Sequence, residues 1–182
     1  MSAIIFDGRV AAKKRKEELR IRVTSLLGRG IRPKLVSFYL PQDEGSALYT
    51  RIKKKMAEEV DISFEDVKLE NTERGLKSAI TQISQFNTDK EVHGILVQKP
   101  SGENNFKEED WQKLVSAIDP SKDVDGLTGK SPRFLPATVK AVLLVLEKAG
   151  ALRKENNFVV VGDTDILGKP LVQYLETLGE KV

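Results

Sequence analysis

Tyr49 and Lys53 are the first residues whose types and spacing suggest chemistry, because they lie four residues apart in a segment of helical periodicity. A helix is predicted over 45–60, and we expect its buried stripe to consist of the apolar residues spaced four apart, Leu48, Ile52, Met56 and Val60. Tyr49 and Lys53 lie about 100° further round, at the edge of that stripe. A lysine there could act as a general acid or base in a pocket. The same spacing also fits an exposed lysine beside a half-buried tyrosine.

Gln98 is a second candidate, because it directly follows the apolar run 92–97, a strong buried-strand pattern. Ligands of open α/β sheets gather at the carboxyl ends of the strands. Gln98, with Pro100 just after it, is therefore a candidate ligand contact, although a glutamine bonded only to the turn has the same pattern. His93, inside the run, is expected to be a hydrogen-bonded sheet residue rather than a catalyst.

Two carboxylates, Asp123 and Asp125, stand just before Gly126 in a segment rich in turn formers. A calcium loop is excluded, because its twelfth position, which requires Glu, falls on Pro132. The carboxylates could accept hydrogen bonds from the N–H groups of a heterocycle. The alternative is ordinary turn chemistry, since Asp and Gly both favour turns.

A possible phosphate-binding turn follows the apolar run 158–161, the second predicted buried strand. A loop between Gly162 and Gly168 leads there into a predicted helix, which is the layout of a phosphate-binding βα turn. The loop is not a Walker A motif, because Pro170 stands where Ser or Thr belongs. It is not G-x-G-x-x-G either, because Thr164 replaces the middle glycine.

The composition excludes several other chemistries. The absence of cysteine rules out disulfides, thiolate zinc sites and cysteine nucleophiles, and one histidine cannot supply a histidine-based metal site, so we expect no metal. The net charge is only 30 − 27 = +3, and the short basic runs have acidic neighbours, so we expect no nucleic-acid partner. No apolar stretch approaches the roughly 18–20 residues of a membrane span. We expect a cytoplasmic protein without a membrane partner.

Helix and strand signals alternate along the chain. Strands are predicted at 34–40, 64–69, 92–97 and 158–161, and helices at 9–28, 45–60, 73–86, 107–118, 137–149 and 168–178. Near-continuous apolar strands between helices indicate an α/β fold with helices layered on a mostly parallel sheet. The loop-rich segment 119–136 is the best candidate for a domain boundary.

Taken together and in this order, the motifs resemble the bifunctional methylenetetrahydrofolate dehydrogenase/methenyltetrahydrofolate cyclohydrolase family. The matching stretches are Ser46-x-x-Tyr49-x-x-x-Lys53-x-Lys55, the run 92–98 with Pro100, Lys122-Asp123-Val124-Asp125-Gly126, and the turn from Gly162 to Gly168-Lys169-Pro170. The resemblance covers nearly the whole chain. It implies a three-layer folate-binding catalytic domain at 1–131 and, at 132–182, the beginning of a Rossmann-type NAD(P)-binding domain that is incomplete at this length.

The resemblance implies an enzyme of one-carbon folate metabolism that serves purine biosynthesis. The family oxidises 5,10-methylenetetrahydrofolate with NADP or NAD, and then hydrolyses the methenyl product to 10-formyltetrahydrofolate. By motif match, Lys53 manages protons at the one-carbon bridge and Tyr49 stacks along the aminobenzoate. Gln98 bonds near Lys53, and Asp125 anchors the pterin. The implied substrate-binding residues are Tyr49, Lys53, Gln98, Pro100, Asp123 and Asp125. A homodimer is implied by analogy.

The implied cofactor-binding residues, which include departures from the family pattern, are Gly162, Asp163, Thr164, Ile166 and Gly168. The family has Gly-Arg-Ser where this chain has Gly-Asp-Thr, and Asp163 would repel the phosphate that the arginine meets. Lys99-Pro100-Ser101-Gly102 replaces Leu-Pro-Leu-Pro in one pocket wall. The acidic residue that discriminates NAD from NADP would fall beyond residue 182. We therefore expect cyclohydrolase activity at most if 182 residues are the native length. The alternative is a non-catalytic folate-binding or dimerising regulator of the same fold.

Overall fold

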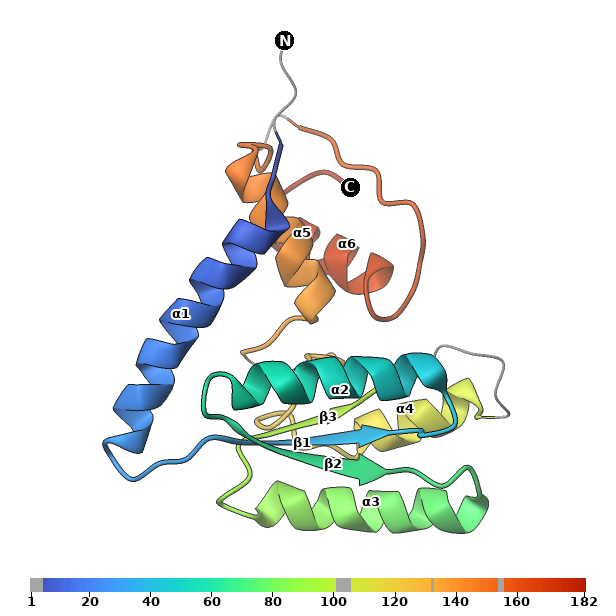
Figure 1. Ribbon diagram of the computed structural model, residues 1–182. Helices are drawn as coiled ribbons and strands as arrows, with labels where there is room; N and C mark the ends of the chain where they lie inside the picture. The colour runs from blue at the N-terminus through green and yellow to red at the C-terminus, as the bar shows by residue number, and fades with distance from the viewer. Residues whose placement is uncertain (1–4, 101–105, 132, 154–155) are drawn as a thin grey trace.

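The computed structural model describes residues 5–100, 106–131, 133–153 and 156–182. Helices and strands alternate along the chain (Figure 1), in the order α1 (Gly8–Leu27), β1 (Lys34–Tyr39), α2 (Glu44–Glu58), β2 (Ser63–Lys68), α3 (Glu73–Thr88), β3 (Gly94–Val97), α4 (Glu108–Ser116), α5 (Ala137–Lys148) and α6 (Gly168–Thr177). Except for 158–161, each predicted element is confirmed to within a few residues at its ends. Ser101 and Gly102, part of the altered pocket wall, lie outside the described residues.

The three strands form a parallel sheet in the order β2-β1-β3, so β1 lies in the centre. Figure 1 shows α2 on one face of this sheet and α3 on the other, with α4 contacting α3 and β3. The main core fills the space between sheet and helices, and its members include Val36, Phe38, Ile83, Ile95, Trp111 and Leu114. These layers confirm the α/β fold class with a parallel sheet.

Helices α5 and α6 enclose a second, smaller apolar cluster. It is centred on Val139, Leu171 and Leu175, with Phe158 and Val160 packed against it. The two separate cores agree with two units along the chain, although the boundary between 131 and 132 stays a prediction. No helix in the described ranges is long and apolar enough to cross a bilayer.

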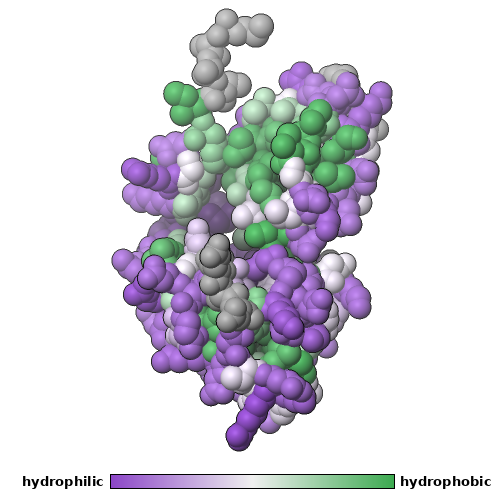
Figure 2. All heavy atoms as spheres, turned by 90° about the vertical axis from the view of Figure 1, so that its right-hand side faces the viewer, coloured by the Kyte–Doolittle hydropathy of each residue, from purple (hydrophilic) through white to green (hydrophobic). Residues whose placement is uncertain are grey.

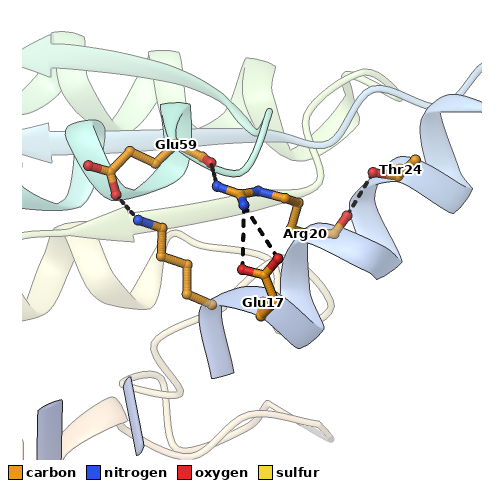
Figure 3. A network of polar contacts seen from close by, with 5 residues as sticks. Glu17, Arg20, Thr24 and Glu59 are labelled. Atoms are coloured by element: carbon orange, nitrogen blue, oxygen red, sulfur yellow. Dashed lines mark hydrogen bonds and ion pairs between the residues drawn. The ribbon is translucent and has the colours of Figure 1, made fainter. Parts of the chain in front are cut away.

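Helix α1 runs from the second unit to the sheet unit, where polar contacts tie it to the end of α2 (Figure 3). Arg20 donates from Nη2 to the carbonyl oxygen of Glu59 at 3.1 Å, and Lys16 bonds to the Glu59 carboxylate. The hydrogen bond and positive charge of Lys16 lower the pKa of Glu59. These contacts attach α1 to the residue that ends α2.

The segment 158–161 is not a buried strand, and this prediction is wrong. Among the described residues, the only β-bridge next to this segment is an isolated one between Asn157 and Lys181. The side chains of Val159 and Val161 are 88% and 95% exposed. A fully buried strand needs cover on both faces, and here only Phe158 and Val160 are covered. Figure 2 shows apolar surface exposed in the upper part of the molecule, which contains the unit of α5 and α6.

The buried stripe predicted for α2 is also wrong. Leu48, Ile52 and Met56 are 48%, 44% and 48% exposed, and only Val60, beyond the end of the helix, is buried. The face that packs on the sheet consists of the small residues Ser46, Thr50 and Ala57. Periodicity identified an apolar face of this helix, but that face does not lie against the core.

Matched isoleucine truncations test this assignment. We expect Ile83→Ala, in the fully buried core, to lower the free energy of unfolding by about 2–5 kcal/mol. Ile52→Ala, on the exposed stripe, should change it by no more than about 0.5 kcal/mol. Urea denaturation measures both values, and equal losses would mean that the stripe is buried after all.

Candidate functional site

Lys53, Gln98 and Asp125 come from separate parts of the chain and meet beside the carboxyl end of β3. The Nζ of Lys53 donates to Oε1 of Gln98 at 2.9 Å and lies 3.8 Å from Oδ2 of Asp125. The side chains of Lys53 and Asp125 are 35% and 25% exposed, so both are half-buried yet open to a ligand. The structure thus brings three predicted site residues together.

The start of α2 sets the direction in which Lys53 points. Asp43 caps the helix by accepting from the amide of Ser46 at 2.6 Å. The hydroxyl oxygen of Ser46 in turn accepts from the amide of Leu40, directly after β1. These bonds hold Ser46 against the sheet, and Thr50, one turn later, is buried on the same side of α2. Lys53 extends from the helix to Gln98, directly after β3.

Gln98 is held by its backbone and by its neighbours. Its amide donates to the carbonyl of Phe38 at 2.8 Å, which continues the β1–β3 ladder. The indole N–H of Trp111 bonds to the carbonyl of Val97 at 3.3 Å. Lys99 then turns to Trp111, with its Nζ 4.7 Å from the ring centroid and 2.8 Å from a carboxylate oxygen of Glu108.

The loop that carries Asp125 is packed closely against its surroundings. Gly94 allows this, because a Cβ there would lie 2.6 Å from Cγ1 of Val124. Gly126 has φ +67°, and a Cβ there would lie 2.4 Å from the carbonyl oxygen of Phe134. The two glycines explain why this loop can lie so close to β3 and to the segment before α5.

The remaining predicted substrate contacts lie in different environments. Tyr49 is 55% exposed and lies one helical turn before Lys53, with the exposed Ile52 and Met56 beside it. Pro100 is half-buried. Asp123 is only 1% exposed, and its carboxylate bonds to its own loop rather than lying open to a ligand.

Sequence reasoning assigned Ile52 and Met56 to the core, whereas both are exposed on the helix face that carries Tyr49 and Lys53. Together with Tyr49 they form an apolar and aromatic surface beside Lys53, suited to a flat aromatic ligand. The available signal was that their positions on the helix lie close to those of Tyr49 and Lys53.

Lys54, although adjacent to Lys53, belongs to another contact. Its Nζ bonds to Oδ1 of Asp66 at 2.5 Å, on the β2 side of α2. This hydrogen bond and the charge of Asp66 raise the pKa of Lys54. Lys54 is therefore tied to the sheet, whereas Lys53 faces the site.

The turn 162–168 is closely packed on itself, since a Cβ on Gly168 would lie 2.1 Å from the carbonyl oxygen of Gly162. The first backbone donors of α6 are already used, however. The amides of Gly168 and Lys169 donate to Oγ1 and the carbonyl of Thr164, at 3.4 and 3.2 Å. Pro170 has no N–H.

The other residues of the turn are packed, charged or hydrogen-bonded in ways that limit their contact with a cofactor. Ile166 packs against the main core, and Asp163 is exposed at the turn. Asp165 accepts from Gln112 of α4 at 3.3 Å and from Lys169 at 2.7 Å. The turn therefore carries two carboxylates and contacts the sheet unit.

The hydrogen bond from Lys169, and then the positive charges of Lys169 and Lys99, lower the pKa of Asp165. We expect Lys169→Met to raise that pKa toward the ordinary value of an aspartate, measured by carboxyl ¹³C NMR titration. Lys113→Met, which removes the partner of Asp110, is the matched control and should leave Asp165 unchanged. The lowered pKa means that the pair stabilises the fold above the ordinary aspartate pKa, and that this contribution is lost as the pH falls through the lowered value. An unchanged Asp165 titration in Lys169→Met would contradict the assignment.

The described residues contain no group of three or more His, Asp or Glu side chains that could hold a metal ion. The fold and site define an α/β domain with a parallel sheet. A lysine of α2, an amide just after β3 and a carboxylate of the 123–128 loop meet beside the carboxyl ends of its strands. Residues 6–125 match the family model of the tetrahydrofolate dehydrogenase/cyclohydrolase catalytic domain. The chain belongs to this family.

Known relatives agree with this assignment. The chain is 35% identical over 183 residues to the bifunctional protein FolD of Halalkalibacterium halodurans, covering 96% of this chain and 64% of that protein. It is 38% identical over 184 residues to FolD of Acetivibrio thermocellus, covering 96% and 62%. The chain thus spans a little over three-fifths of the length of these curated relatives.

Solved structures show the same fold. The bifunctional FolD methylenetetrahydrofolate dehydrogenase/cyclohydrolase of Campylobacter jejuni superposes with a TM-score of 0.83 and 29% identity, covering 97% of this chain and 64% of that one. The Trypanosoma brucei enzyme, solved with NADP and an inhibitor, gives a TM-score of 0.85 and 28% identity, covering 100% and 63%.

Proposed function

We propose that this chain binds a reduced folate at the Lys53 site and hydrolyses 5,10-methenyltetrahydrofolate to 10-formyltetrahydrofolate. The observation that carries this proposal is the position of Lys53 between the acceptor Gln98 and the carboxylate Asp125. A lysine held in this way, half-exposed beside an apolar surface, can exchange protons with a bound ligand. Family membership makes a folate the ligand class.

In the proposed reaction, water attacks the one-carbon bridge of the methenyl cation. Lys53, in its amine form and oriented by Gln98, accepts one proton as the new C–O bond forms. The resulting ammonium returns that proton to N5 as the bond between the bridge carbon and N5 breaks. The remaining hydroxyl proton passes to solvent, which leaves 10-formyltetrahydrofolate and one released proton.

The other site residues hold the folate in the proposed complex. Asp125 accepts hydrogen bonds from N–H groups of the pterin, and Tyr49 stacks along the aminobenzoate. Ile52 and Met56 extend that apolar contact, while Pro100 borders the site after Gln98. The exposure of Tyr49, Ile52 and Met56 supports this arrangement.

The residues of the 162–168 turn do not fit the phosphate of the dinucleotide that the family implies. An anion site at a helix N-terminus needs free backbone donors, whereas the first donors of α6 bond to Thr164 or are missing at Pro170. Asp163 and Asp165 add two negative charges, and Lys169 offsets one. We therefore derive no hydride-transfer step and assign the chain the hydrolytic reaction.

The decisive variants are two adjacent lysines on α2. We expect Lys53→Met to reduce hydrolysis by at least about a hundredfold, because it removes the proton-transferring group. Lys54→Met should retain activity, since that side chain bonds to Asp66. The measurement is the loss of methenyl absorbance after correction for spontaneous hydrolysis. Undiminished activity in Lys53→Met would overturn the mechanism, and folate binding without turnover by the wild type would indicate a non-catalytic folate-binding protein.

The misfit of the turn predicts that neither NADP⁺ nor NAD⁺ binds with micromolar affinity or supports oxidation of 5,10-methylenetetrahydrofolate. Isothermal titration calorimetry and NAD(P)H absorbance measure the two properties. Asp163→Arg, which removes a carboxylate and adds a cation, should strengthen binding of NADP⁺ relative to the wild type. Saturable micromolar binding by the wild type would refute the prediction.

A homodimer and a cytoplasmic location complete the proposal, on the basis of family membership. The two exposed valines of the 158–161 segment are compatible with a subunit contact. Analytical ultracentrifugation determines the oligomeric state, and a concentration-independent monomer would remove the dimer from the proposal.

A further inference from the structure

Asp123 lies two residues before Asp125 but in a different environment. Its side chain is 1% exposed, and its carboxylate accepts three hydrogen bonds from the end of its own loop. Oδ2 accepts from the amide of Thr128 at 2.9 Å and from its hydroxyl at 2.7 Å, and Oδ1 accepts from the amide of Leu127 at 3.3 Å. With its acceptor positions turned inward, this carboxylate is not presented to a ligand.

We propose that Asp123 is the positioning residue of this site: it closes the loop 123–128 and thereby presents Asp125 to Lys53 and to the substrate. This inference rests on the proposed folate-binding role of Asp125. It replaces the expectation that Asp123 itself contacts the substrate.

The beginning of the loop is fixed independently. The amide of Ile95 in β3 donates to the carbonyl of Lys122 at 2.8 Å, and Ile95 and Asp123 form a parallel bridge. The Nζ of Lys122 bonds to the carbonyl oxygens of Phe86 and Asp89 at the end of α3, at 2.7 and 2.5 Å. Asp123 therefore lies at the point where the loop leaves the sheet.

The carboxylate of Asp123 connects this anchored start to the loop's far end. Asp125 lies between the two attached points, with Val124 packed on Gly94 on one side of it and Gly126 in the left-handed region on the other. Every backbone position from 122 to 128 is thereby constrained directly or by its neighbour. The distance of 3.8 Å between Asp125 and Lys53 depends on these constraints.

Hydrogen bonding to a charged acceptor explains why a carboxylate serves here. A buried carboxylate is costly unless it is hydrogen-bonded, and three donors satisfy this one. A neutral replacement would leave the amides of Leu127 and Thr128 without a charged acceptor, and hydrogen bonds to charged groups are stronger than neutral ones. The loop would then sample other conformations, and Asp125 would be presented less often.

Thr128→Val is the mildest test, because it removes one donor to Asp123 and preserves side-chain shape. We expect KM for methenyltetrahydrofolate to rise about tenfold while kcat changes by less than about twofold, since the effect passes through folate anchoring. Asp123→Asn should act in the same direction and more strongly. Ser121→Ala is the matched control, because the Ser121 hydroxyl bonds to the exposed Asp119 of the same segment at 2.6 Å, and its KM should stay unchanged.

A double-mutant cycle identifies the route of the effect. In an Asp125→Asn background, Thr128→Val should raise KM no further, because the residue that it positions has lost its charge. A purely structural role would instead lower the active fraction, and therefore apparent kcat, with KM unchanged in both backgrounds. That result, or an additive KM effect in the double variant, would overturn the proposal.

The failure of the proposed reaction is distinguishable from the failure of this inference. If the wild type binds 5-formyltetrahydrofolate but does not turn over the methenyl substrate, the proposed reaction is refuted. The double-mutant cycle is then measured through the Kd for 5-formyltetrahydrofolate, followed by the fluorescence of Trp111. If the wild type binds no folate, both proposals fall. Wild-type activity with Thr128→Val and Asp123→Asn indistinguishable from Ser121→Ala refutes the positioning role alone.

Discussion

The hydrogen bond between Lys53 and Gln98 depends on the parallel pairing of β1 with β3. The two residues are 45 positions apart, and they meet because α2 follows β1 while Gln98 follows β3. Parallel neighbours end at the same edge of a sheet, so the segments that leave them are brought side by side. The 122–123 segment then lies against β3 and delivers Asp125 to the same edge. Without this pairing the three functional groups would have no common position.

The packing of α2 shows how this site is kept open. Its sheet-facing side consists of small residues, and its larger apolar side chains remain exposed. Leu48, Ile52 and Met56 are exposed, so their apolar surface does not stabilise the fold. Burial would contribute roughly 25 cal/mol to the free energy of folding for each Å² of apolar surface removed from water. A ligand with an aromatic body can cover that surface. A stability argument alone would not favour this arrangement of α2.

The two carboxylates of the 123–125 segment lie in different environments. Asp123 is buried and satisfied by donors of its own loop, whereas Asp125 is partly exposed and lies 3.8 Å from Nζ of Lys53. In the 162–168 turn, too, polar groups already have partners. A backbone donor at the start of α6 bonds to Thr164, and Asp165 accepts a hydrogen bond from α4. In each case local bonding decides which polar groups remain available to a ligand.

The sequence by itself determined the alternation of elements, the parallel α/β class and the order of the motifs that carry the family resemblance. Periodicity, capping residues and glycine positions are local properties, so they can be seen without a fold, as with the cap of α3 by Thr72. Only the tertiary structure decided which face of α2 is buried, which of Asp123 and Asp125 is exposed, and that 158–161 lies uncovered. These outcomes depend on partners distant in sequence or on the direction of individual hydrogen bonds. An apolar stripe reveals one face of a helix, but the element that packs against the helix decides whether that face meets the core or a ligand.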